Sequence, residues 1–166
     1  MKLSTIILLL ISINALAGEP EVCKGNIKAR SFLSEWREGD RAVSILTTIQ
    51  GSEVSRERGR IAYQADLNSD DNPDYIFESF DSQGSAKDRT FGIFVQCKGF
   101  LHFVGGDYFA GVEEAGSTSN NYKDVAFLSY QRNDLDEIIY VKGQALTRLH
   151  FWSFNPSSGR YEGDMD

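Results

Sequence analysis

The chain has 166 residues and a formal net charge of −7 at pH 7, from 17 Lys and Arg against 24 Asp and Glu. Nucleic acids and anionic membranes reward clustered Lys and Arg, so we expect neither as a partner. A basic protein partner is compatible with this charge.

The first seventeen residues have the three parts of a bacterial export signal. Lys2 provides the positive start, residues 6–13 an apolar run, and Ala15-Leu16-Ala17 the small-x-small pattern that precedes cleavage. The apolar run is about half of the ~20 residues that span a bilayer, and Glu19 stands where a lipoprotein needs cysteine. We therefore expect residues 18–166 to form a single periplasmic or secreted domain without a membrane anchor. Loss of Lys2 would leave this domain a net charge of −8.

Two cysteines, Cys23 and Cys97, follow the signal. In an oxidising compartment an even number of cysteines predicts a disulfide, which would join the N-terminal segment to the middle of the chain. A nucleophilic cysteine is disfavoured because neither has a histidine beside it in sequence. No paired-cysteine spacing indicates a zinc site.

Beyond Cys23 the dominant hydrophobic period is two, which predicts a mainly β fold. Short aromatic and β-branched runs separated by polar turns are expected as strands: 91–97, 100–104, 125–130, 137–141 and 149–154. Residues 29–37 are open to two interpretations, a short helix with Phe32, Leu33 and Trp36 on one face, or a twisted strand.

A weak internal repeat supports the β prediction. Residues 74–80 align with 124–130, and residues 101–103 with 149–151, at offsets near 50. Two units are too few to close a propeller. We expect a compact antiparallel sheet or small sandwich built from two degenerate units of ~50 residues.

Residues 66–74 read Asp-Leu-Asn-Ser-Asp-Asp-Asn-Pro-Asp. Side-chain oxygens recur at Asp66, Asn68, Asp70 and Asp74, loop positions 1, 3, 5 and 9, which suits a hard cation that takes six to eight oxygen ligands. The spacing predicts one Ca²⁺ ion.

This loop, placed between two strand-like segments, resembles the calcium loop of FG-GAP and VCBS-type repeats. The segments 121–124 and 149–161 resemble the end of small periplasmic relatives of those repeats. The resemblance implies Asp66, Asn68, Asp70 and Asp74 as side-chain ligands and the Asn72 carbonyl as a backbone ligand. The sequence departs from the pattern at Asp71, where the family has Gly at a sharp turn; Asp tolerates the left-handed conformation moderately well.

Two other interpretations of the loop compete with this calcium site, and the first of them, an EF-hand, fails. An EF-hand would need flanking helices and an acidic residue at position 12, which is Phe77 here. A purely polar hairpin turn would need no metal. In the second unit, Gly116, Thr118 and Asn120 replace the first three ligands and only Asp124 remains, which favours one ion per chain.

Catalytic motifs are missing from the sequence, and we expect a protein that is not an enzyme. His102 and His150 lie inside aromatic strands, where packed or edge histidines are common. A carboxylate pair for glycoside hydrolysis could come from Glu78, Glu113, Glu114, Asp136 and Glu137. Acidic surface residues are common, however, and a sequence does not give the separation of such a pair.

Two functions fit these observations. The first is recognition of a protein partner, such as inhibition of a basic enzyme of the cell envelope, with residues 107–121 as a recognition loop. The side chains expected to contact the partner there are Tyr108, Phe109, Glu113 and Glu114. The second is a carbohydrate- or surface-binding module that stacks sugar rings on exposed aromatics: Tyr108, Phe109, Trp152 and Tyr161. An acidic protruding loop would favour the first function and an exposed row of aromatics the second.

Overall fold

The computed structural model describes residues 21–24, 28–34, 42–84 and 87–163. In these residues the chain is almost entirely antiparallel β-structure, as predicted. One turn of 3-10 helix (η1, Glu21–Cys23) precedes the strands β1 Ala29–Ser34, β2 Ala42–Ile49, β3 Ser52–Ala65, β4 Asp74–Gln83, β5 Arg89–Cys97, β6 Phe100–Phe109, β7 Gly111–Ser119, β8 Tyr122–Tyr130, β9 Tyr140–Val141, β10 Gln144–Ala145, β11 Thr147–Asn155 and β12 Arg160–Gly163.

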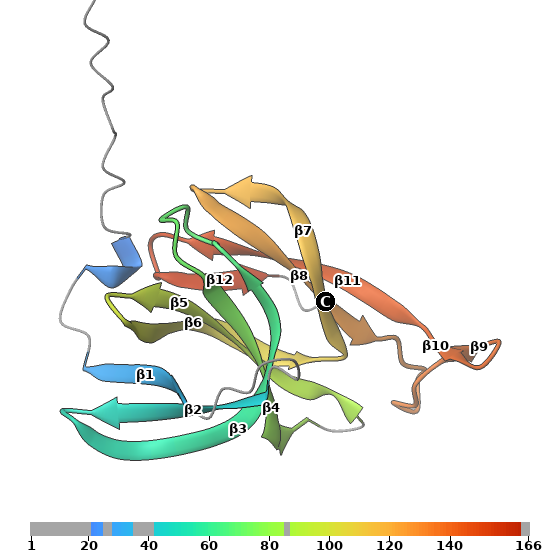
Figure 1. Ribbon diagram of the computed structural model, residues 1–166. Helices are drawn as coiled ribbons and strands as arrows, with labels where there is room; N and C mark the ends of the chain where they lie inside the picture. Colours follow the sequence, from blue (N-terminus) through green and yellow to red (C-terminus); the bar gives the residue numbers. More distant parts are fainter. Residues whose placement is uncertain (1–20, 25–27, 35–41, 85–86, 164–166) are drawn as a thin grey trace, which may run out of the picture.

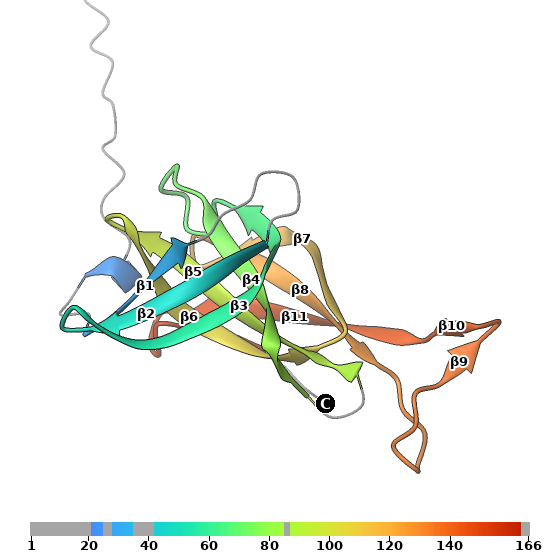
Figure 2. The ribbon, with the colours of Figure 1, turned by 60° about the horizontal axis from the view of Figure 1, so that its bottom comes forward.

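The first six strands form a closed barrel in sequence order. Strand β1 pairs with β2 along its whole length, but its pairing with β6 consists of Ser31 opposite Leu101. The barrel is therefore joined near one end of β6, and further along β6 the two strands separate (Figure 2).

The other long strands form a four-stranded sheet in the order β12-β11-β8-β7, which packs against the outside of the barrel (Figure 1). Phe109 of β6 stacks on Phe127 of β8, with ring centroids 4.1 Å apart. Gly105 permits the close approach of β6 to β12, since a Cβ there would lie 3.0 Å from the Tyr161 carbonyl oxygen. The interface holds the larger apolar cluster, whose buried members include Ile76, Ile93, Val95, Val104, Val125, Trp152 and Phe154.

A smaller apolar cluster fills one part of the barrel interior. It comprises Val43, Ile45, Ile61, Phe77, Phe94 and Leu101. Because strand side chains alternate between faces, β4 and β5 contribute to both clusters: Ile76 points to the sheet and Phe77 into the barrel.

The segment with two interpretations is a strand where it is described. Phe32 pairs with Leu46, and Leu33 with Ile45, so the helix alternative is wrong for residues 29–34: tertiary pairing overrides a weak helical pattern. Residues 35–37 and the expected signal at 1–17 lie outside the described residues. In the part of the chain that is described, no helix has the length and apolarity to cross a membrane.

The internal repeat corresponds to two hairpins, β3–β4 and β7–β8, whose second strands start at or near the aligned residues Asp74 and Asp124. After the hairpins the units diverge. β4 pairs with β5, whereas β8 pairs directly with β11. The predicted strand at 137–141 is reduced to an isolated bridge at Ile138 and the short β9.

Candidate functional sites

The predicted calcium loop connects β3 to β4 and is held by its own side chains. Asp66 accepts hydrogen bonds from the Asp70 and Asp71 amides, both at 3.1 Å. Asn68 Oδ1 also accepts from the Asp70 amide, and Asp70 Oδ1 accepts from the Asn72 amide at 2.9 Å. These side chains form a compact series of Asx turns.

Asp71 adopts a left-handed conformation with φ of 65°. This is the position where the FG-GAP and VCBS pattern has Gly, and Asp is among the non-Gly residues that tolerate it best. The backbone thus makes the sharp turn that the resemblance implies.

Asp74 is fully buried at the start of β4. Its two carboxylate oxygens accept hydrogen bonds from the Leu67 and Gln96 amides, both at 2.8 Å. Burial, with smaller contributions from the charges of Asp70 and Asp66, nevertheless raises the pKa of Asp74 to about 7, although the two amide hydrogen bonds act to lower it. A cation in the loop would relieve this repulsion.

The loop supplies carboxylate and amide oxygens, the ligands that Ca²⁺ takes in proteins. Within the described residues, no three His, Cys, Asp or Glu side chains gather as a metal site. Here the oxygens of Asp66, Asn68 and Asp70 turn to backbone amides. The residues fit the ion by chemistry, because a side-chain oxygen that accepts one amide hydrogen bond keeps a second lone pair for a cation.

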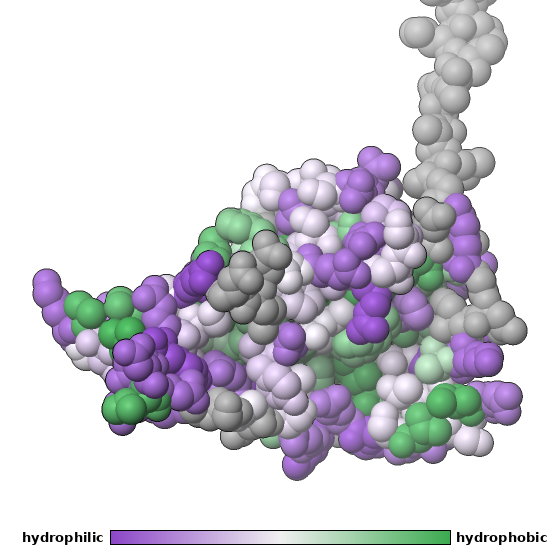
Figure 3. All heavy atoms as spheres, turned by 180° about the vertical axis from the view of Figure 1, so that it is seen from behind, coloured by the Kyte–Doolittle hydropathy of each residue, from purple (hydrophilic) through white to green (hydrophobic). Residues whose placement is uncertain are grey.

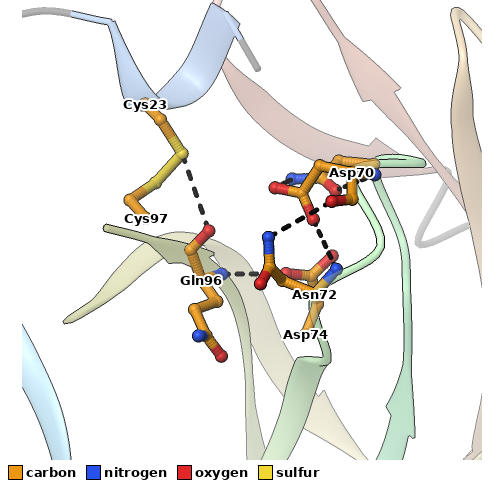
Figure 4. Close-up of a disulfide and its surroundings, with 7 residues drawn as sticks. Cys23, Asp70, Asn72, Asp74, Gln96 and Cys97 are labelled. Carbon is orange, nitrogen blue, oxygen red and sulfur yellow. Dashed lines mark hydrogen bonds between the residues drawn. A yellow bond between two sulfur atoms is a disulfide. The ribbon is translucent and has the colours of Figure 1, made fainter. Parts of the chain in front are cut away.

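The predicted disulfide between Cys23 and Cys97 is present, with Cα atoms 5.4 Å apart, a normal spacing for the bond. It lies beside the loop (Figure 4). Cys23 Sγ is 3.8 Å from the carbonyl oxygen of Gln96, and the amide of the same residue binds Asp74. The acidic loop, the end of β5 and the N-terminal segment therefore meet at Gln96.

The counterpart of Asp74 in the second hairpin has different surroundings. Asp124 is also buried, and burial alone would raise its pKa. The hydroxyls of Ser117, Ser153 and Ser119 outweigh that effect and hold the pKa of Asp124 below its usual value. Serine hydroxyls thus stabilise the carboxylate where the second unit has lost its other ligand positions.

The four residues predicted to contact a partner do not form one surface. Phe109 is completely buried, so its assignment as a contact residue is wrong. Tyr108, its neighbour on β6, faces the barrel and is 48% exposed. Glu113 and Glu114 are exposed but successive on β7, so they point to opposite faces.

The expected recognition loop at 107–121 is also corrected. Its residues complete β6 and form β7, which pairs with β8 from Gly111 opposite Leu128 to Ser119 opposite Tyr122. Gly and Asn, which are frequent in this run, have low strand propensity, but pairing with the apolar β8 decides its conformation.

Sequence reasoning missed a protrusion formed by residues 131–146, here called the 131–146 arm. It extends away from the end of β8 and β11 and carries the β9–β10 hairpin (Figures 1 and 2). Leu135 is 78% exposed and Tyr140 52% exposed. The exposed carboxyl side chains of Asp134, Asp136 and Glu137 lie near them in sequence. The polar turn at 133–134 was the feature of the sequence that could have indicated this arm.

The arm is ordered at its base and its turn. Backbone hydrogen bonds join Gln131 to Leu146 at 2.9 Å and Asn133 to Glu137 at 3.0 Å. Arg132 forms an ion pair with Asp88 at 2.9 Å, which ties the arm to the segment before β5. Preorganisation of this kind lowers the entropy lost on binding.

The aromatics proposed to stack on sugars are mostly internal. Trp152 and Tyr161 are buried with Phe109, which leaves Tyr108 as the exposed member of that set. The histidines are packed as expected: His150 is buried and lies 2.7 Å from Ser129 Oγ, and burial lowers the pKa of His102.

No protein-family model matches the chain, and neither the characterised proteins nor the solved structures contain a match to it. The FG-GAP and VCBS resemblance stays a prediction from the loop.

Proposed function

We propose that the protein is an exported, calcium-binding domain without catalytic activity that recognises a basic protein partner of the cell envelope, such as a cell-wall-degrading enzyme, through the 131–146 arm. The observation that carries the proposal is the protrusion itself. It carries exposed apolar side chains, Leu135 in the turn at 133–137 and Tyr140 on β9, together with the exposed carboxylates of that turn.

Such a surface suits recognition for two reasons. Exposed apolar residues such as Leu135 and Tyr140 provide anchors that a partner can bury. The carboxylates on either side of Leu135 would raise the association rate with a basic partner and disfavour acidic ones. The chain's net charge of −7 acts in the same direction.

The disulfide and the calcium loop serve as the scaffold in this proposal. Asp66, Asn68, Asp70 and Asp74 would hold the ion with their side chains and Asn72 with its carbonyl. The ion would neutralise carboxylates that otherwise repel one another near Asp74. It would stabilise the folded state by about 2.7 kcal/mol at a hundredfold excess over its dissociation constant.

Calcium is tested by thermal melting with Ca²⁺ and with chelator, for the wild type and Asp70→Asn. An asparagine oxygen can still accept the Asn72 amide hydrogen bond, but it removes a ligand charge. We expect Ca²⁺ to raise the melting temperature of the wild type and to have a much smaller effect on the variant. Equal melting of the wild type in both solutions would reduce the loop to a polar turn.

Partner binding is tested by interferometry and inhibition assays against a panel of basic peptidoglycan hydrolases. For a hydrolase that the wild-type protein binds, the double variant Leu135→Ala with Tyr140→Ala should bind about thirtyfold or more weakly. High salt should slow association of the wild type. Phe151→Ala, which removes an exposed aromatic of β11, is the matched control and should bind normally. Absence of binding to every hydrolase, with co-sedimentation on insoluble peptidoglycan instead, would favour the carbohydrate-binding alternative.

A further inference from the structure

The barrel interior is only partly filled by the smaller apolar cluster described above. Beside that cluster lies a hollow of about 830 Å³, open to solvent on one side. In the view from behind, green apolar atoms lie in a recess between purple polar ones (Figure 3). Pockets that bind small molecules have volumes of roughly 300–1,000 Å³.

Small side chains on the inner wall explain why the hollow exists. Gly92 and Thr90 of β5, Thr47 of β2 and Ser31 of β1 line it. The interior of a narrow barrel is normally packed with larger side chains. At Gly92 a Cβ would come within 2.8 Å of the Phe94 ring, so the glycine lets aromatic rings lie along the wall.

Aromatic rings form the apolar part of the lining. Phe94 contacts Phe77 and Phe103 edge to face, at centroid distances of 6.4 and 5.5 Å. Phe103 is 44% exposed and Tyr108 is 48% exposed, although both face the hollow. Their exposed faces lie on the part of β6 where β1 no longer pairs with it.

The charges of the described lining residues balance. Glu57 and Asp107 contribute two carboxylates, and Lys24 and Lys28 contribute two ammonium groups. Burial lowers the pKa of His102, which keeps its ring neutral at pH 7. A lining with no net formal charge favours an uncharged occupant over an ion, because an unmatched buried charge is costly.

We propose that this hollow binds a small, uncharged, mainly apolar molecule with a ring system, which packs against Phe94, Phe103 and Tyr108 and hydrogen-bonds to the hydroxyls of the wall. The site lies inside the barrel and uses none of the residues of the calcium loop or of the 131–146 arm. The proposal for this site is therefore independent of the proposed function.

The test is fluorescence titration of the purified protein with uncharged N-phenyl-1-naphthylamine. We expect saturable binding with one site per chain. Thr47→Trp, which places a large ring in the hollow, should abolish it. Thr48→Trp is the matched control on the same strand and should bind normally: Thr48 is not part of the lining, and each substitution removes one hydrogen bond to β1.

A second pair keeps the proposal testable if Thr47→Trp does not fold. Phe103→Ala should weaken binding about tenfold, which corresponds to about 1.4 kcal/mol. Phe80→Ala, 49% exposed on β4 but outside the hollow, should bind like the wild type. Non-saturable binding, or unchanged affinity in Phe103→Ala, would overturn the proposal. Tighter binding of the anionic analogue 8-anilinonaphthalene-1-sulfonate would overturn the assignment of an uncharged ligand.

Discussion

Glu78 gives the sharpest prediction about stability. Its carboxylate on β4 is 1% exposed and is bound on one side by Arg60, at 2.5 Å, and on the other by Arg89. The two arginine side chains are about half exposed, at 50% and 51%. The ion pairs are therefore asymmetric, because the anion is buried while both cations reach water.

This asymmetry sets the expected costs. Replacing Arg60 and Arg89 together by Met leaves the buried Glu78 carboxylate without a counterion, which should lower the free energy of unfolding by about 3–5 kcal/mol. Replacing Glu78 by Met leaves two arginines that can hydrate, and the methionine fills the site, so the cost should stay below about 2 kcal/mol. In the protein that lacks both arginines, Glu78→Met should then increase stability.

Urea unfolding of the wild type, Glu78→Met, the arginine double variant and the triple variant measures these values. The triple variant should be more stable than the double variant. If Glu78→Met destabilises the arginine-deficient protein, Glu78 is held by something other than the two cations and the reasoning fails.

Three further predictions follow from buried contacts. Replacing Cys23 and Cys97 by Ser opens a loop with a sequence separation of 74 and should cost about 4 kcal/mol in denaturant unfolding; an unchanged midpoint would contradict this. In chelator, stability should fall as pH rises from about 4 through 7, by an amount on the order of 4 kcal/mol, because the folded state binds the proton of buried Asp74 more tightly than the unfolded chain does. Asp74→Asn should lack that part of the pH dependence, and a variant with the wild-type profile would refute it. Gly59→Ala should cost more than about 2 kcal/mol, since its Cβ would lie 2.1 Å from the Glu78 carbonyl oxygen, whereas Gly111→Ala meets only an ordinary contact at 3.7 Å and should melt almost like the wild type.

The strands and the disulfide could be predicted because their signals are local or few. Alternation over 91–97 and 149–154 identifies β5 and β11, and two cysteines allow a single pairing. Barrel closure could not be predicted, because it depends on Ser31 meeting Leu101 from 70 positions away. No local pattern encodes such a contact.

The candidate contact residues failed for a related reason. Tyr108 and Phe109 are adjacent aromatics on a strand, so one must face inward and the other outward, and composition does not say which. An irregularity in the β5–β6 register between Ile93 and Phe94 helps to set the phase of β6. The 131–146 arm was missed because its exposed Leu135 and Tyr140 resemble the ends of core strands in the sequence.

The position of the disulfide also bears on the order in which the chain matures. Cys23 leaves the ribosome well before its partner, and the strands β1 to β4 lie between the two cysteines in sequence, with Cys97 at the end of β5. The bond cannot form until β5 has been delivered, and Cys97 immediately precedes the turn into β6, the strand that closes the barrel on β1. Contacts of such long sequence separation form late in folding. Oxidation of the cysteine pair would thus report when β5 reaches its place beside the N-terminal segment, and time-resolved alkylation during refolding of the reduced protein would measure it.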